Sequence, residues 1–544
     1  MRRIFRRLVL GGIALFAFVT YFWPPFAFSA ILFGPLLFFG LVDYFQTKQS
    51  VRRNYPLVGR FRYLLESIRP EINQYFVESN TDGTPFNREQ RSLVYQRAKH
   101  DLDTLPFGTQ RDVYASGYEW VNHSLSPKHV KSTDLRVVIG GPDCKQPYSA
   151  SVFNISAMSY GSLSPQAVTA LSSGAKQGGF YHNTGEGSVS PYHVAGGGDL
   201  VYQIGTGYFG CRADDGNFSP VKFEATAKHP HIKMIEVKLS QGAKPGHGGI
   251  LPARKVTPEI AAIRGVPMGQ DVLSPPGHKA FETPEGLCHF MKELRELSGG
   301  KPVGFKLCVG KKVEFIAICE AMKKTGITPD FITVDGGEGG TGAAPVEYSN
   351  SVGSPLKDGL IFVHNALTGY NLRSRIRVIA SGKVVTGFDL LRNLAIGADL
   401  CNSARGMMLA LGCIQALRCN SNKCPVGVAT QDKDLAAGLD VPDKAQRVAS
   451  FHHETVKAAA EMMGSMGIAQ AADLKPWMIL RRVSDHEVRH YAELYPYLRG
   501  GELLDARTAP TEWAELLRCV SSESFTPVPE AQNQPEMAKI RLAS

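Results

Sequence analysis

Cysteine is scarce in this sequence: there are 10 in 544 residues, and seven of them stand alone. That is too few for a disulfide scaffold of this length, so the composition favours a reducing compartment. A basic patch with interleaved aromatic residues is also missing, because the 60 basic and 50 acidic residues are dispersed, and we expect no nucleic-acid partner. The 55 glycines follow no period, which excludes a collagen-like or low-complexity chain. With 43% hydrophobic residues, one large catalytic domain with appendages is expected.

Two long apolar runs stand at the N-terminus, separated by Pro24 and Pro25. They cover residues 8–23 and 26–42, and each is close to the ~17 to 25 residues that span hydrocarbon. Basic residues flank the pair on both sides: Arg2, Arg3, Arg6, Arg7, Lys48, Arg52 and Arg53. The positive-inside rule then predicts a transmembrane helical hairpin at 1–45 in the inner or plasma membrane, with both ends and the catalytic domain in the cytoplasm. The alternatives are a single re-entrant segment and a cleaved signal peptide, although no small-residue cleavage site follows the first run.

Short β-rich stretches alternate with helical ones from about residue 150 onward. The β-rich stretches are SVFNISAMSYGS, HIKMIEVKLS, PVGFKLCVG, PDFITVDGG, RIRVIASG and GADLCNSARG. Because polar and glycine-rich residues recur where these strands end, the pattern favours an α/β fold with a (β/α)8 TIM barrel over an open sheet. We expect a cytoplasmic connecting region at 46–148, the barrel at 149–465 and a helical C-terminal extension at 466–544.

One glycine-rich loop argues for a different fold. In FITVDGGEGGTG, Gly337, Gly339 and Gly342 have the G-x-G-x-x-G spacing of a dinucleotide-binding unit. However, Pro345 falls where the first helical turn would need backbone hydrogen bonds, and no acidic residue closes a second strand at the expected distance. The loop is better suited to bring backbone amides close to a flavin. The predicted cofactor contacts in this loop are Gly340, Thr341 and Gly342.

Two stretches late in the expected barrel indicate a phosphate site. VIASGKVVTG and GADLCNSARG fall where the loops after the seventh and eighth strands of such barrels bind phosphate. Backbone amides at Ser381 and Gly382, with Arg405 nearby, are predicted to hold a doubly charged phosphate. Ordinary barrel turns are the alternative.

Three cysteines gather in CIQALRCNSNKCPVGVAT, where five and then four residues separate Cys413, Cys419 and Cys424 and a proline follows the third. Zinc prefers four ligands, and no fourth Cys or His lies in this stretch, whereas a disulfide would leave one thiol over. Three thiolates on a tight loop before a proline are typical of iron-sulfur ligation, and three ligands suit a 3Fe-4S cluster. Three structural thiols are the alternative. With a flavin beside a cluster, electrons would arrive singly and leave as a hydride.

Several long motifs occur in order over residues 150–465: AMSYGSLSPQA, NTGEGS, EVKLSQGAKPGHGGILP, GGEGGTGAAP and the cysteine run ending in CPVGVAT. Together they resemble the FMN-binding synthase domain of glutamate synthases, here in a stand-alone and membrane-anchored form. The resemblance implies a (β/α)8 barrel, FMN and a 3Fe-4S cluster. It also implies reductive amination of 2-oxoglutarate to glutamate through 2-iminoglutarate.

By position, the resemblance makes the three cysteines the cluster ligands and places Glu186, Lys244 and Arg264 in the oxo-acid site, with the first two catalytic. Arg264 offers a bidentate fork to a carboxylate, and the Lys244 ammonium can polarise a keto or imine centre. The alternatives are a helix-end role for Arg264, a solvated loop lysine, and a glutamate that caps backbone amides. Lys306 is predicted to face the electron-rich edge of the flavin rather than to form a buried ion pair. Ser159 in AMSYGS is predicted to be a further cofactor contact.

Two positions depart from the family pattern and leave the oxo acid open. Ile250 stands where a glutamine is common, and His247 where a glutamate is common. We also expect no glutaminase domain in this protein, and we therefore expect ammonia, a separate amidotransferase or another amino donor to supply nitrogen. Because no nicotinamide domain is recognisable, we expect a separate electron donor such as a ferredoxin. The other function considered is a membrane-associated electron-relay or assembly protein that keeps both cofactors without oxo-acid turnover.

Overall fold

The computed structural model describes residues 2–527, and the chain divides into two compact units, Met1–Arg88 and Glu89–Ser544. The boundary between them falls inside the predicted connecting region, 46–148. The end of the predicted C-terminal extension, residues 528–544, lies outside the described residues.

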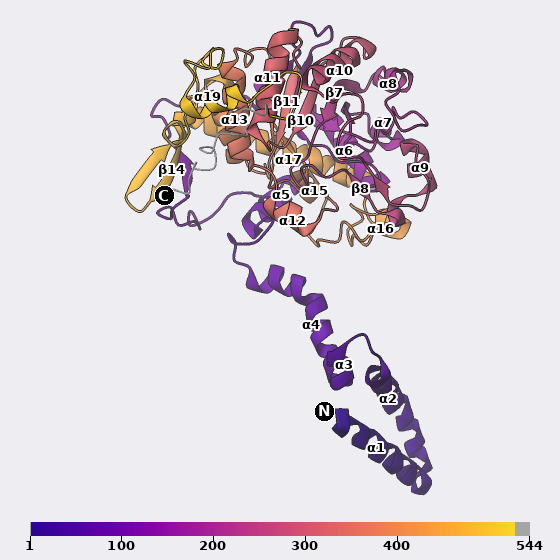
Figure 1. Ribbon diagram of the computed structural model, residues 1–544. Helices are drawn as coiled ribbons and strands as arrows, with labels where there is room; N and C mark the ends of the chain where they lie inside the picture. The colour runs from indigo at the N-terminus through magenta and orange to yellow at the C-terminus, as the bar shows by residue number, and fades with distance from the viewer. Residues whose placement is uncertain (1, 528–544) are drawn as a thin grey trace. The chain divides into compact units, whose positions relative to one another are not determined.

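Helices make up the described part of the N-terminal unit (Figure 1). Their bounds are α1 Arg2–Phe22, η1 Pro24–Ser29, α2 Ala30–Phe45, α3 Ser50–Asn54, α4 Val58–Ile72 and the π-helical turn η2 Asn73–Val77. Two segments, α1 and η1 with α2, are long and apolar enough to cross a membrane. The guanidinium carbon of Arg2 lies 4.4 Å from the centre of the Tyr44 ring, so the start of α1 lies beside the end of α2. The predicted helical hairpin is therefore present as a fold.

A closed barrel of eight parallel strands forms the centre of the second unit, and the predicted (β/α)8 fold is confirmed. In barrel order the strands are β4 Phe153–Ile155, β5 Tyr181–Asn183, β6 Asp199–Ile204, β7 Ile232–Lys238, β10 Val303–Leu307, β11 Phe331–Asp335, β12 Arg377–Ser381 and β13 Leu400–Ser403. Six of them lie in the stretches expected from the sequence, and β5 and β6 are additional. The closed barrel excludes the dinucleotide-binding alternative.

Many helices of this unit begin with the same sequence signal. In five of them a Ser or Thr hydroxyl accepts a hydrogen bond from a first-turn N–H, and proline takes the first helical position. These are α6 Pro165–Gly178, α7 Pro191–Gly196, α8 Pro220–Ala227, α9 Pro258–Arg264 and α10 Pro284–Leu297. Later helices are α11 Lys312–Thr325, α12 Val346–Ser351, α13 Leu356–Gly369, α14 Gly387–Ile396, α15 Arg405–Ala410, α16 Lys433–Ala437 and α17 Val441–Ser465. Figure 1 shows α10, α11 and α13 around β7, β10 and β11.

The amino-terminal end of the barrel is filled by apolar side chains. One cluster of buried residues contains Tyr181, Val201, Met234, Phe331, Ile379 and Leu400 from six strands. An antiparallel hairpin, β2 Arg136–Ile139 with β3 Tyr148–Ser151, adds Ile139 and Ala150 to this cluster. The hairpin therefore closes the barrel at this end, and the barrel interior is a packed core rather than a pore.

A polar layer follows, two residues further along the strands. Glu236 on β7 accepts hydrogen bonds from three other strands of the barrel: from Asn183 at 2.8 Å, Gln203 at 2.5 Å and Thr333 at 2.7 Å. These donors satisfy the buried carboxylate, which would otherwise be costly to desolvate. Because side chains on one face of a strand repeat every two residues, Lys238 lies above Glu236, at the carboxyl end of the barrel.

The C-terminal extension is only partly helical, which corrects the prediction for 466–544. It contains a hairpin, β14 Ile479–Ser484 and β15 Glu487–His490, that pairs with β1 Glu119–Val121 in an antiparallel sheet. No local pattern specifies this sheet, because its first strand lies more than 350 residues before its second.

The remaining elements are α5 Arg88–Lys99, η3 Ser132–Asp134, β8 Ile250–Leu251, η4 Ala253–Lys255, β9 Val272–Leu273, η5 Ala471–Asp473, η6 Pro476–Met478, α18 Tyr491–Leu494 and α19 Thr511–Arg518.

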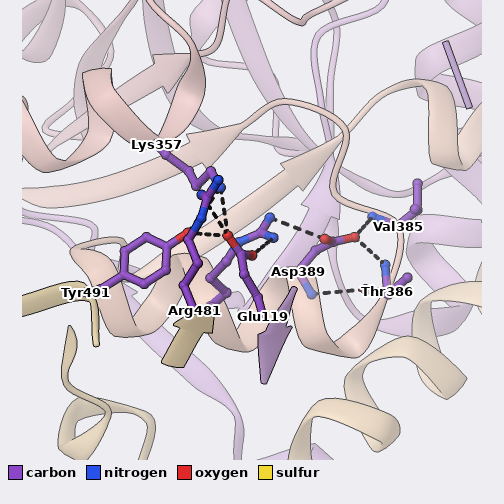
Figure 2. Close-up of polar contacts among 8 residues, drawn as sticks. Glu119, Lys357, Val385, Thr386, Asp389, Arg481 and Tyr491 are labelled. Carbon is purple, nitrogen blue, oxygen red and sulfur yellow. Dashed lines mark hydrogen bonds and ion pairs between the residues drawn. The ribbon is translucent and has the colours of Figure 1, made fainter. Parts of the chain in front are cut away.

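Glu119 on β1 joins this sheet to the helices of the barrel (Figure 2). Its carboxylate oxygens lie 2.9 Å from Lys357, 2.9 Å from Arg392, 3.2 Å from Arg481 and 2.6 Å from the Tyr491 hydroxyl. Burial alone would raise the pKa of Glu119, but Arg392 and Lys357 outweigh it and lower the pKa to about 2. One ionised carboxylate therefore links β1, β14, α13, α14 and α18.

Candidate active site

Glu186, in the loop after β5, lies among positively charged side chains at the carboxyl end of the barrel. Lys238 Nζ, at the end of β7, is 3.0 Å from Glu186 Oε1. Burial opposes ionisation of Glu186, but Lys238, Arg264 and Lys306 outweigh it and hold the pKa of the carboxyl below its ordinary value. The side-chain contact of Glu186 is thus an ion pair rather than the predicted alternative, a cap on backbone amides.

Glycines make room for the Glu186 carboxylate. A Cβ at Gly205 would lie 2.6 Å from Glu186 Oε2, and a Cβ at Gly249 would lie 2.2 Å from Oε1. Gly249 belongs to the stretch EVKLSQGAKPGHGG, so this loop folds directly over the carboxylate. A small cavity of about 20 Å³ lies beside Glu186, Lys238 and His247, with room for about one water-sized molecule.

Lys244 is buried in the same loop, with 1% of its surface exposed. Its Nζ donates a hydrogen bond to the Ala343 carbonyl at 2.9 Å. Burial, followed by repulsion from Lys238, lowers the pKa of Lys244 to about 8. A solvated loop lysine, the predicted alternative, does not describe this side chain. A lysine with this pKa can exchange a proton near neutral pH.

Arg264, the last residue of α9, is also buried, with 4% of its surface exposed. One guanidinium nitrogen donates to the Tyr160 carbonyl at 2.8 Å, and the group lies 5.1 Å from the centre of the Phe209 ring. Its Nε has no hydrogen-bond partner within residues 2–527. The Gly265 N–H, rather than Arg264, bonds the last carbonyls of α9. Burial lowers the pKa of Arg264 to about 10, so it stays a cation at neutral pH.

Lys306 on β10 is in register with Lys238 on β7, so two lysines stand side by side at this end of the barrel. Lys306 is 5% exposed. Its Nζ makes no hydrogen bond or direct ion pair within the described part of the chain, so the buried ion pair considered as an alternative is not formed. The Nζ atom is not among the fully buried polar atoms, so an ammonium that has no partner in the described chain is open to a ligand at this position.

The predicted phosphate residues lie at the ends of β12 and β13, the seventh and eighth barrel strands. The Ser381 hydroxyl donates to Asp335 Oδ1 at 3.0 Å. Arg405 donates to the Glu338 carbonyl at 2.6 Å, and the Asp335 and Glu338 carboxylates both attract it. Because the Ser381 hydroxyl is occupied, the backbone amides of Ser381 and Gly382 remain the predicted phosphate donors.

The predicted flavin loop lies between Arg405 and the cysteine stretch. Gly340, Thr341 and Gly342 are exposed in the loop after β11. A Cβ at Gly340 would lie 2.6 Å from Arg405 Nε, and one at Gly342 would lie 4.0 Å from Cys419 Cβ. The same short loop therefore borders both the predicted phosphate residues and the predicted cluster residues.

Cys413, Cys419 and Cys424 are free thiols between α15 and α16. Burial, followed by the neighbouring thiols Cys419 and Cys424, raises the pKa of Cys413, and burial followed by Cys424 raises the pKa of Cys419. The Tyr95 hydroxyl donates to the Cys413 carbonyl at 2.7 Å. Lys255 is buried nearby and donates to backbone carbonyls, including that of residue 429, at 2.9 Å. Within residues 2–527, no group of three or more His, Cys, Asp or Glu side chains has the geometry of a metal-ion site. The iron-sulfur cluster therefore stays a prediction, although the donor set suits it.

The remaining predicted residues border the Glu186 loop. Ser159 donates through its hydroxyl to the Ser162 hydroxyl at 3.1 Å, and a Cβ at Gly185 would lie 2.7 Å from the Ser159 nitrogen. His247 lines the small cavity beside Glu186, whereas Ile250 begins β8 outside it. Of the two departures from the family pattern, His247 is thus the one at the carboxylate.

A family model described as the conserved region in glutamate synthase matches residues 124–469. The chain belongs to the glutamate synthase family. The matched region contains every predicted site residue, from Ser159 to Cys424, and it confirms the resemblance seen in the sequence.

Several relatives share this region. The glutamate synthase large subunit-like protein YerD of Bacillus subtilis is 38% identical over 483 residues, which covers 81% of this chain and 90% of that protein. The archaeal glutamate synthase (NADPH) of Methanocaldococcus jannaschii is 33% identical over 66% of each chain. The glutamate synthase (NADPH) large chain of Azospirillum brasilense is 32% identical, and the match covers 57% of this chain but 20% of that one. The chain therefore spans slightly less than two thirds of the archaeal relative.

Two residues of this glutamate synthase site were missed by sequence reasoning. Lys238 makes the ion pair with Glu186. It stands at the end of the charged strand IKMIEVK, and a charge at the end of a barrel strand is the signal that singled out Lys306. Gln241 Nε2 is buried without a hydrogen-bond partner within residues 2–527, and the residue lines the cavity beside Glu186. Together with Arg264 Nε, it offers an unused donor at the site.

Proposed function

We propose that this member of the glutamate synthase family is an FMN-dependent oxidoreductase that converts 2-oxoglutarate, or a related 2-oxo acid, to the amino acid. In the balanced reaction, 2-oxoglutarate, ammonium, two electrons and two protons give glutamate and water. The observation that carries the proposal is the set of cations around Glu186. These are Lys238, Lys244, Arg264 and Lys306. Such a surplus of buried positive charge suits a dicarboxylate.

The residues at the carboxyl end of the barrel fit FMN. Lys306 carries an ammonium without a direct partner in the described chain, and Gly340 allows the backbone to approach Arg405 closely. Bound FMN would supply the hydride that reduces the imine carbon. Lys306 would set its charge against the electron-rich edge of the flavin, and the amides of Ser381 and Gly382 would bind its phosphate.

The substrate would lie over Glu186. Arg264 would bind one carboxylate through its unpartnered Nε, in the fork geometry that a guanidinium offers. Lys244, whose pKa is about 8, would donate to the keto oxygen as nitrogen adds and water leaves. Glu186 would keep Lys238 charged and in place, because the two groups form an ion pair at 3.0 Å. The loop that covers Glu186 would exclude bulk water.

Cys413, Cys419 and Cys424 would hold a 3Fe-4S cluster, which passes electrons singly. The position of Gly342, where an added Cβ would lie 4.0 Å from Cys419 Cβ, supports a short path from the cluster to the flavin loop. The electron donor would be a ferredoxin or another separate protein. Nitrogen would come from free ammonia, a separate amidotransferase or another amino donor.

The N-terminal hairpin would hold the enzyme at the inner or plasma membrane, with the catalytic unit in the cytoplasm. Two helices long and apolar enough to span it support this proposal. Their large side chains are exposed: Leu8 is 68% exposed, and Ile31 is 77% exposed. Arginines flank the hairpin at both ends, as expected of ends that stay in the cytoplasm.

One assay tests the function. The purified protein, reduced chemically, is incubated with 2-oxoglutarate and ammonium, and glutamate is measured. We expect glutamate that depends on both substrates, and a panel of other 2-oxo acids would identify the preferred one. A protein that contains flavin and iron, yet forms no amino acid from any 2-oxo acid, would instead be an electron-relay or assembly protein.

A further inference from the structure

Helix α4 exposes a continuous apolar face within the N-terminal unit. Its large apolar residues are exposed by 38% to 65%: Phe61, Leu64, Leu65, Ile68 and Ile72. With 3.6 residues per turn, these side chains fall within an arc of roughly 100°. The face continues into the next turn, where Phe76 is 85% exposed. An exposed apolar stripe of this length marks an interaction surface.

The opposite face and the borders of α4 are polar. Tyr63 and Glu66 lie opposite the apolar stripe. Arg62 and Arg69 border it on one side, and Glu71 and Ser67 lie on the other side. Residues 1–77 contain ten arginines and lysines but only three acidic residues. An apolar stripe bordered by arginines is typical of a helix that lies in a membrane interface, where the long side chains reach the headgroups.

The start of α4 is tied to the end of the apolar hairpin. Asp43, on the last turn of α2, is fully buried. Its carboxylate accepts hydrogen bonds from Arg52, from Arg60 at 2.7 Å and from the Leu57 N–H at 3.2 Å. Arg60 also lies 4.6 Å from the centre of the Phe39 ring. These contacts fix the first turn of α4 at the same end of α2 where Arg2 meets Tyr44.

We propose that α4, together with η2, binds the surface of the membrane that the hairpin crosses. The apolar stripe lies at the boundary between headgroups and acyl chains, and Arg62 and Arg69 contact anionic phospholipid headgroups. The inference rests on the proposed membrane anchor, which brings the surface within reach of a helix that starts 13 residues after α2 ends. A second copy of the chain or its own catalytic unit would be the other occupants of the stripe.

The test places a photoreactive benzophenone amino acid in the full chain at Leu65 or Ile68, in the apolar stripe, and at Ser67 as the matched control outside the stripe. The protein is reconstituted with its cofactors into phosphatidylcholine vesicles, with or without phosphatidylglycerol, and adducts are identified by mass spectrometry. We expect lipid adducts at Leu65 and Ile68 to exceed those at Ser67 by about five-fold or more. Arg62→Gln with Arg69→Gln should lower the yield more in the anionic vesicles.

Extraction with alkaline carbonate separates this inference from the anchor. A chain that stays in the vesicles but forms adducts at Leu65 and Ile68 only with protein would overturn the inference alone, and would identify the other occupant. Equal lipid yields at Leu65 and Ser67 would overturn it as well. A chain that carbonate releases from the vesicles would overturn the anchor and the inference together.

Discussion

Buried positive charge exceeds negative charge around Glu186 at the scale of single residues. Lys238 pairs with this carboxylate, whereas Lys306 has no direct partner and Arg264 leaves a buried Nε unused. Lys244 lies close enough to Lys238 for repulsion to lower its pKa. Desolvated cations without partners are costly, so an anionic ligand would stabilise the site as well as react in it.

The first prediction concerns the carboxylate contact. Arg264→Lys should lower kcat/KM for the 2-oxo acid at least about ten-fold, because lysine supplies charge without the planar fork. Flavin reduction by an artificial donor and iron content should not change. Arg254→Lys is the matched control, since Arg254 is exposed on the neighbouring turn η4. Wild-type rates with every oxo acid tried would move the substrate site elsewhere.

The second prediction concerns pH. The ammonium of Lys244 is lost as pH rises through its pKa of about 8, so kcat/KM for the oxo acid should fall above that pH. Lys244→Met should lower kcat/KM by about 100-fold and remove this alkaline limb. Lys301, whose pKa burial also lowers to about 8, donates to the Ala227 carbonyl far from this loop. Lys301→Gln should keep the limb, and its loss in that variant would contradict the assignment.

Site residues in long sequence motifs could be predicted, whereas residues whose role depends on contacts across the fold could not. Glu186, Lys244 and Arg264 lie in long motifs, and the structure brings all three together. Lys238 stands at a strand end, as Lys306 does, but its ion pair with a carboxylate 52 residues earlier has no sequence signal. The unpartnered state of Gln241 Nε2 likewise has no sequence signal.

At the scale of elements, two loops determine the proposed electron path. The loop after β11 borders Arg405 on one side and Cys419 on the other. The cysteine loop leaves α15 and is tied to α5 by the hydrogen bond from the Tyr95 hydroxyl to the Cys413 carbonyl. Tyr95, which precedes the barrel in the chain, thus helps to hold the cysteine loop, which follows the last barrel strand.

The third prediction tests the cysteine loop. The anaerobically purified protein should contain about three irons per chain, and Cys419→Ser should lose them while the flavin stays bound. Cys144→Ser is the control, because Cys144 is a partly exposed thiol in the turn between β2 and β3. Full iron content in Cys419→Ser, measured with metal analysis and electron paramagnetic resonance, would refute the cluster.

The fourth prediction concerns Glu119. Its pKa falls from 4.5 in the unfolded chain to about 2, so its stabilising effect is complete above pH 4.5 and is lost as pH falls toward 2. Glu119→Gln should destabilise the catalytic unit by about 3 kcal/mol at neutral pH, and by less at pH 3. Thermal unfolding at both pH values measures this. Glu512→Gln, which removes an exposed ion pair with Lys312, should change stability by less than about 0.5 kcal/mol.

The elements that were not predicted from the sequence are either very short or pair with a strand far away in the chain. β5 has three residues, all buried and partly polar, so no alternating pattern marks it. β14 and β15 pair with β1, which lies far earlier in the chain, and a pairing at that separation leaves no local signal. The six predicted barrel strands are apolar and end in glycine or polar loops, which is a strong signal.

At the scale of the whole molecule, a flavin enzyme of the proposed kind is joined to an apolar hairpin through a basic, amphipathic helix. The hairpin was readable from two apolar runs and their arginines. The role of α4 was not readable in the same way, because its stripe is short and only the structure shows that the rest of the N-terminal unit leaves it exposed. The boundary between the two units, at Arg88, lies well beyond the end of the hairpin at Phe45. A truncation that removes only the hairpin therefore leaves α4 attached to the catalytic unit.

The last prediction separates the hairpin from α4 with two truncations. Removal of residues 1–45 leaves the apolar stripe of α4 in place, so this protein should still sediment with anionic vesicles and be released by high salt or carbonate. Removal of residues 1–88, up to the boundary between the two units, should abolish vesicle binding. Both proteins should stay yellow, because every predicted flavin contact lies in the second unit, from Ser159 onward. Equal sedimentation of the two truncated proteins would contradict a membrane role for α4. Loss of flavin from the shorter protein would show instead that the N-terminal unit is needed for the catalytic fold.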